Sequence, residues 1–204
     1  MRTAIISDIH GNLDGLLATL VDAEAASCDR VICLGDIVDG GPSDARVVRE
    51  LMRRGVTCIR GNHDEVAQLE AGGPELSFLN GLPLTLVEDD TLYTHITPRR
   101  VERKIRDRFE AWNVFDETPQ RLAFIGHVHI PLIFSHRHGT TGAAREEQFD
   151  YNRPLSLDPA DRYIICPGAV GYGRDGVKAV RYGIYDKAAS TVEIRRIDGR
   201  VLDL

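Results

Sequence analysis

The sequence predicts an α/β fold in which two packed β-sheets form a sandwich that is flanked by helices. First, short apolar, β-branched runs at 2–7, 31–34 and 56–59 are typical of strands that are covered on both faces. Second, helical periodicity separates these runs, so the first third of the chain reads β-α-β-α-β and predicts a parallel sheet. Third, the rest of the chain contains mostly short strands separated by turns, which predicts the second sheet.

Each predicted element has its own signal. Leucines repeat at helical spacing over 13–21, and a second helical repeat over 47–52 follows the start signal Pro42-Ser43-Asp44. The polar turn Glu88-Asp89-Asp90 predicts a hairpin between the runs 84–87 and 92–96. The remaining predictions are a helix over 98–112, a loop over 136–154, and strands over 122–125, 132–135, 163–166, 177–185 and 192–197.

Length and composition favour one globular enzyme. A chain of 204 residues suffices for one sizeable core, so we expect a single domain over residues 1–204. The chain contains no apolar run of about 18 residues that could span a membrane. Asp8 interrupts the place where a signal peptide would be apolar, which favours a cytoplasmic protein. A net charge of −6 argues against stable nucleic-acid binding, which usually requires a basic face.

Polar groups follow the predicted strands where each strand ends. In α/β sheets ligands bind beyond the carboxyl ends of the strands, so these groups are expected to meet at one edge. Taken singly, Asp8 can be a helix cap, Asn62 a turn residue and His95 a core histidine. Taken together, the five groups contain five of the seven histidines, which favours a common site. The groups are Asp8-Ile9-His10, Gly35-Asp36-Ile37-Val38-Asp39, Gly61-Asn62-His63-Asp64, Thr94-His95 and Gly126-His127-Val128-His129.

Metal binding explains this set of side chains. Imidazole and carboxylate ligands suit first-row divalent ions such as manganese, iron, nickel, cobalt or zinc. The set is too large for one ion, and a carboxylate can bridge two. Two ions about 3.5–4 Å apart can activate water and clamp a phosphoryl group during its displacement. Glycines at 35, 61 and 126 would let the backbone turn sharply and approach the site.

The order Asp-x-His, Gly-Asp-x-x-Asp, Gly-Asn-His-Asp, His, Gly-His-x-His resembles the signature of the calcineurin-like metallophosphoesterase superfamily. The flanking stretches IISDIHGNLDGLLATL, CLGDIVDGG and CPGAVGYGRDG extend the resemblance over nearly the whole chain. They look like the small bacterial and archaeal phosphodiesterases of that superfamily. The resemblance implies an α/β/β/α metallophosphoesterase-like sandwich and two divalent metal ions, with manganese expected first.

The resemblance also implies a role for each matching residue. His63 would lie over the substrate, stabilise the phosphoryl oxygens and protonate the leaving group, and Asp39 would orient His63. Asp64 would either cap the following helix or take part in catalysis. The implied ligands of one ion are Asp8, His10, Asp36 and His129, and those of the other are Asp36, Asn62, His95 and His127, with Asp36 bridging.

The expected substrate is a small phosphate ester, foremost a small or nucleotide-like phosphodiester. Serine/threonine phosphatases and dinucleoside tetraphosphatases of the superfamily carry an arginine where this chain has Gly40. Its absence favours a phosphodiesterase, in which Arg99 and Arg100, or alternatively Arg60, would contact the anionic substrate. The alternatives are a phosphomonoesterase or protein phosphatase-like enzyme, a dinucleoside polyphosphate hydrolase, and a noncatalytic metal-binding scaffold.

Overall fold

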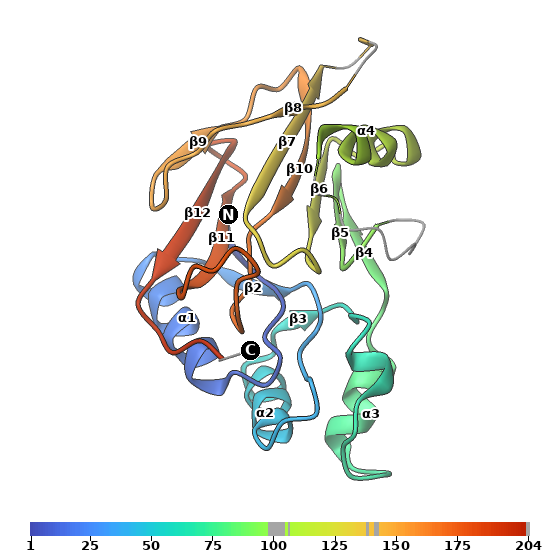
Figure 1. Cartoon of the computed structure of the whole chain (residues 1–204), viewed down its shortest axis with the longest axis vertical. Coiled ribbons are helices and arrows are strands. Elements are labelled where there is room, and N and C mark those ends of the chain that lie inside the picture. Colours follow the sequence, from blue (N-terminus) through green and yellow to red (C-terminus); the bar gives the residue numbers. More distant parts are fainter. Residues whose placement is uncertain (98–104, 106, 138, 141–142, 203–204) are drawn as a thin grey trace.

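Two six-stranded β-sheets pack face to face, and helices lie on the outer side of each (Figure 1). A computed structural model describes residues 1–97, 105, 107–137, 139–140 and 143–202. The layers follow the order helix, sheet, sheet, helix. The predicted two-sheet α/β sandwich is therefore confirmed.

The first sheet contains the predicted β-α-β-α-β unit. β1, β2 and β3 are parallel, whereas β11 pairs antiparallel with β1. Helices α1 (Leu13–Ala25) and α2 (Asp44–Arg54) make the crossovers and cover the outer face. The order of its strands is β3 (Thr57–Cys58), β2 (Arg30–Cys33), β1 (Arg2–Ile6), β11 (Val180–Asp186), β12 (Thr191–Ile197) and β9 (Pro154–Ser156).

The second sheet holds the other strands that lead to the site. β5, β6 and β10 are parallel, and the predicted hairpin joins β4 to β5. Helix α4 (Arg108–Glu117) packs on its outer face, and α3 (Pro74–Gly81) packs against α2. The order of its strands is β4 (Thr85–Glu88), β5 (Thr91–Thr94), β6 (Leu122–Ile125), β10 (Asp161–Cys166), β7 (Leu132–Arg137) and β8 (Arg145–Glu146).

Alternation along the strands divides the apolar residues among three cores. In β1, Ile6 faces the helices α1 and α2, while its neighbour Ile5 faces the second sheet. In β6, Phe124 faces the first sheet and Ile125 faces α4. Successive side chains of a strand point to opposite faces, so an apolar run of four or five residues is buried on both sides. This explains why these strands lack the apolar–polar alternation of half-exposed strands.

Several predicted elements are wrong in their bounds, such as the strand predicted over 177–185, which begins at Val180. The helix predicted over 98–112 runs from Arg108 to Glu117, because the Asp107 side chain accepts hydrogen bonds from two amides of the first turn. Residues 98–104 lie outside the described residues. The loop predicted over 136–154 includes β8, which pairs with β7. No helix in the described part of the chain is long and apolar enough to cross a membrane.

Candidate metal centre

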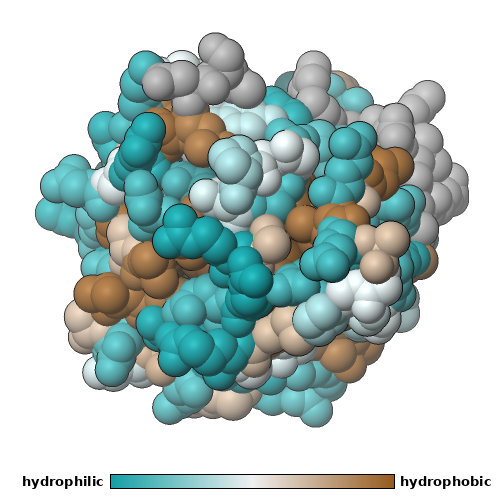
Figure 2. Space-filling view, turned by 90° about the horizontal axis from the view of Figure 1, so that it is seen from below, coloured by the Kyte–Doolittle hydropathy of each residue, from teal (hydrophilic) through white to brown (hydrophobic). Residues whose placement is uncertain are grey.

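The loops that follow β1, β2, β3, β5 and β6 converge at one end of the sandwich, in agreement with the sequence prediction. Backbone hydrogen bonds tie them together: the amide of Asp8 donates to Gly35, and the amide of Gly126 donates to His95. The end of the molecule that carries α1, α2 and α3 is seen from below in Figure 2, and hydrophilic residues gather in its middle. Polar side chains from both sheets can thus meet beside a well-packed core.

One group of four buried side chains brings its ligand atoms within 4.8 Å of one another: Asp8, His10, Asp36 and His129. Nε2 of His129 lies 3.1 Å from Oδ1 of Asp8 and 3.2 Å from Nε2 of His10. Nε2 of His10 lies 3.8 Å from Oδ2 of Asp36. Two carboxylates and two imidazoles therefore face one small volume.

A second group shares Asp36 with the first. Ligand atoms of Asp36, His95 and His127 also lie within 4.8 Å of one another, and Nε2 of His95 is 3.0 Å from Oδ2 of Asp36. Oδ1 of Asn62 is buried, and no described residue hydrogen-bonds to it. Asp36 is thus common to these two groups, while His10 also belongs to a third group with Asp39 and His63.

The hydrogen bonds of the histidines fit metal binding. Nδ1 of His95 lies 2.8 Å from the carbonyl oxygen of Leu34, and Nδ1 of His129 lies 3.0 Å from that of Tyr172. A ring nitrogen that donates to a carbonyl leaves a lone pair on Nε2. Both Nε2 atoms face carboxylate oxygens, so either a proton on the ring or a metal cation beside it makes the contact favourable. The donor set therefore fits divalent metal ions.

The pKa shifts of the same groups show how strongly they interact. Burial alone raises the pKa of Asp8, but the attraction of His129, His95 and His10 together outweighs burial and holds that pKa well below its usual range. Burial alone lowers the pKa of His95, but contact with Asp36 raises it to about 9. Burial lowers the pKa of His10 to about 4, against the attraction of Asp8 and Asp36. The carboxylates thus stay ionised and favour positive charge between them.

The backbone is left-handed at five of the candidate ligands. The φ angles are 54° at Asp8, 49° at His10, 52° at Asp36, 64° at His127 and 63° at His129. Such angles are uncommon for residues other than glycine, although aspartate and histidine adopt them more often than most. Strained residues of this kind gather where the surrounding structure fixes a functional geometry. The loops therefore hold these side chains in place before any ligand binds.

Two of the predicted glycines permit close packing rather than a sharp turn. A Cβ atom on Gly61 would lie 2.2 Å from the amide nitrogen of Asp36. A Cβ atom on Gly126 would lie 2.2 Å from Oγ of Ser7 and 2.9 Å from Nδ1 of His95. Gly35, by contrast, has a φ of +96° and does turn the chain.

His63 and Asp39 form a pair at the edge of this cluster. Nδ1 of His63 lies 2.5 Å from Oδ1 of Asp39, and the His63 ring stands edge-on to that of His10 with centroids 4.8 Å apart. The backbone amide of His63 donates to Oδ1 of Asp36 at 2.9 Å. The buried carboxylate of Asp44 accepts hydrogen bonds from the amides of residues 39–41 and so fixes the loop that carries Asp39.

Asp64 has a different place from the one expected. Its carboxylate accepts hydrogen bonds from the amides of Gly61, Ile37 and Val38, so it joins the loop after β3 to the loop after β2. Burial raises its pKa to about 6, although these amides oppose the shift. Asp64 is thus a clamp between two loops rather than a helix cap or a group that faces the cluster.

The sequence prediction missed the role of the segment 168–175. The Tyr172 ring packs against His10 and His129, with centroids 5.0 and 4.6 Å away, and Nη1 of Arg174 donates to the carbonyl of His127 at 2.8 Å. In the sequence, the stretch CPGAVGYGRDG only extended the resemblance and carried no role for Tyr172 or Arg174. Three arginines were expected to contact the substrate. Nε of Arg60 lies 3.8 Å from Oε1 of Glu65. Arg99 and Arg100 lie outside the described residues.

A family model for the calcineurin-like phosphoesterase superfamily domain matches residues 1–188. The chain belongs to this superfamily. A metallophosphoesterase from Sphaerobacter thermophilus is 30% identical, with a TM-score of 0.84 over 98% of this chain and 90% of its own. An uncharacterized protein of Methanocaldococcus jannaschii is 29% identical over 96% of this chain and 86% of its own length. A hypothetical protein from Pyrococcus horikoshii, 14% identical with a TM-score of 0.71 over 97% of this chain and 88% of its own, shares the fold.

As a member of the calcineurin-like phosphoesterase superfamily, the chain is a phosphoesterase and therefore a hydrolase of small phosphate esters. The superfamily is metal-dependent, and the buried aspartates and histidines described above can bind a metal ion.

Proposed function

We propose that this enzyme hydrolyses small or nucleotide-like phosphodiesters with two divalent metal ions. The observation that carries the proposal is the shared Asp36, whose carboxylate belongs to both groups of buried ligand atoms. One ion would be held by Asp8, His10, Asp36 and His129, and the other by Asp36, Asn62, His95 and His127. Manganese is the first candidate, and iron, nickel, cobalt and zinc are the others, because mixed imidazole and carboxylate ligands suit all of these ions.

Two divalent ions would supply activation of water and neutralisation of the phosphoryl oxygens. The protein's own contribution follows from its contacts. Asp39, 2.5 Å from Nδ1 of His63, fixes the proton on that nitrogen and turns Nε2 into the group available to the substrate. His63 would hydrogen-bond a phosphoryl oxygen and pass a proton to the departing alkoxide. Preformed loops keep these groups in position without reorganisation during the reaction.

The preference for diesters rests on Gly40, which stands where related phosphatases carry an arginine. A monoester has a doubly charged terminal phosphate that such an arginine would bind, whereas a diester carries one charge and needs less neutralisation. The contacts of Arg99 and Arg100 with the substrate stay a prediction.

The test compares turnover of bis(p-nitrophenyl) phosphate with that of p-nitrophenyl phosphate in the manganese-loaded enzyme. We expect the diester to be hydrolysed faster and elemental analysis to find two ions per chain. His63→Ala should keep both ions but lose about 10²–10⁴-fold in kcat. The matched control is His136→Ala, whose ring packs against Phe115 away from the cluster. Each of three results would contradict the proposal: faster turnover of the monoester than of the diester, only one ion per chain, or wild-type turnover in His63→Ala.

A further inference from the structure

A cavity of about 560 Å³ opens directly beside the candidate metal centre. His10 and Asp39 form the wall nearest to the centre. The other walls are the start of α1, the start of α2 with Ser43 and Arg46, and the C-terminal segment with Arg200 and Leu202. Its volume lies within the range of about 300–1,000 Å³ that small-molecule sites occupy. The cavity is therefore large enough for a substituent of the substrate.

Two arginines, Arg46 and Arg200, and two carboxylates, Asp14 and Asp39, line the cavity. Arg46 is exposed, and its guanidinium makes no ion pair with any carboxylate of the described residues. Arg200 contacts Asp14 at 3.8 Å, but both side chains are more than half exposed, so solvent screens the pair. Asp39 is already engaged by His63. Both guanidinium groups are thus available to an anion.

The backbone next to Arg200 is held firmly. Nδ2 of the buried Asn12 donates to the carbonyl oxygen of Arg200 at 2.7 Å and to that of Val170 at 2.9 Å. The amide of Leu202 donates to Gly171 at 2.9 Å. Asn12 also caps α1 through its side-chain oxygen. One buried side chain therefore fixes the C-terminal segment against the loops that surround the candidate metal centre.

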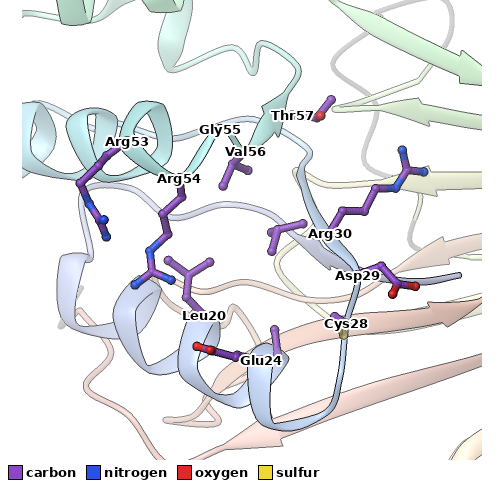
Figure 3. A pocket seen from close by; sticks show the side chains of 12 residues that line it. Leu20, Glu24, Cys28, Asp29, Arg30, Arg53, Arg54, Gly55, Val56 and Thr57 are labelled. Carbon is purple, nitrogen blue, oxygen red and sulfur yellow. The ribbon is translucent and has the colours of Figure 1, made fainter.

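A second cavity of the protein also contains arginines, but it lies away from the candidate ligands and its arginines are paired with carboxylates. It has a volume of about 580 Å³ and lies beside β2, β3 and the ends of α1 and α2 (Figure 3). Its arginines are paired with carboxylates: Arg30 binds Glu88, and Arg53 and Arg54 bind Glu50. Glu24 and Asp29 add further negative charge. An anion would have to displace these pairs, and none of the candidate ligands lines this cavity.

We propose that the cavity of Arg46 and Arg200 binds a second phosphate on one ester arm of the substrate. The substrate class is then a phosphodiester that carries a distal phosphate, such as a 5′-phosphorylated dinucleotide. The inference rests on the proposed function, because the scissile phosphate must lie beside His10 for its arm to enter this cavity. Guanidinium groups bind phosphate oxygens through paired, charge-assisted hydrogen bonds, so two of them favour a phosphate over a neutral group.

The test compares the dinucleotides ApA and pApA, which differ only in the 5′-phosphate, with bis(p-nitrophenyl) phosphate as a diester that lacks the distal group. In the manganese-loaded enzyme we expect kcat/KM for pApA to exceed that for ApA. Arg46→Gln should lower this ratio about 5–10-fold, and Arg46→Gln/Arg200→Gln should lower it further. Arg53→Gln is the matched control, since Arg53 lies on the same helix and lines the other cavity. It should leave the ratio unchanged.

Calorimetric titration of the metal-free protein with the same dinucleotides gives a readout that does not depend on turnover. The subsite is supported if the wild-type protein binds pApA more tightly than ApA and if this difference in affinity disappears in Arg46→Gln. Equal binding of the two dinucleotides, together with a ratio that Arg46→Gln leaves unchanged, would overturn it. The proposed function fails separately, if the manganese-loaded enzyme hydrolyses none of the three diesters.

Discussion

The buried ion pair of Arg181 and Asp175 gives the sharpest prediction about this protein. Arg181 on β11 is fully buried, and Nη2 donates to Oδ1 of Asp175 at 2.9 Å while Nη1 donates to Oδ2 at 2.5 Å. Removing one partner of a buried pair leaves an uncompensated charge, at a cost of about 3–5 kcal/mol. Because the Asp175 side chain is 24% exposed, the pair is only partly removed from water, and Asn at this position can still accept one hydrogen bond from Arg181. We therefore expect Asp175→Asn to lower the free energy of unfolding by about 2–3 kcal/mol.

The assay is urea unfolding of the protein in a chelator, so that metal binding does not contribute. With an m-value of about 2–3 kcal/mol/M, the midpoint should fall by about 1 M. Arg181→Met in the same chain removes the orphaned charge and should recover most of the loss. The control Asp89→Asn removes an exposed partner of Lys187 at a left-handed position that Asn tolerates. Equal midpoints for Asp175→Asn and Asp89→Asn would refute the reasoning.

Three further predictions follow from individual contacts. Asp36→Asn removes the carboxylate common to both ligand groups, so we expect less bound metal and less activity together; unchanged metal content in elemental analysis would contradict the bridging role. Gly126→Ala brings a Cβ atom within 2.2 Å of Oγ of Ser7 and should cost about 1–3 kcal/mol in urea unfolding, with a wild-type midpoint as the contrary outcome. Burial alone raises the pKa of Asp22, but hydrogen bonds from Arg195 and Tyr182 outweigh burial and lower it. The ionised Asp22 therefore stabilises the fold above about pH 4, and this stabilisation is lost as the pH falls further. The difference in unfolding free energy between wild type and Asp22→Asn should shrink from pH 7 to pH 3. A difference that stays constant over this range would contradict the prediction.

The strands and crossover helices around the centre could be predicted because their signals are local. Apolar runs of four or five residues, such as 122–125, define strands buried on both faces. Pro42-Ser43-Asp44 marks the start of α2 within a residue or two. By contrast, β8 consists of Arg145 and Glu146, which are exposed and have no apolar pattern. It is a strand only because β7 lies beside it, and a pairing between distant segments leaves no local signal.

The sequence by itself determined that candidate ligands follow five strands, because parallel strands carry their loops to a common edge. It also determined the family, through the order of Asp8, Asp36, His95 and the other motif residues. Only the tertiary structure decided that Asp64 clamps two loops and that Tyr172 supports His129. These roles depend on contacts between residues that lie between 26 and 43 positions apart in the chain. A side chain's partner is set by how the sheets pack, and that packing is a property of the whole chain rather than of any motif.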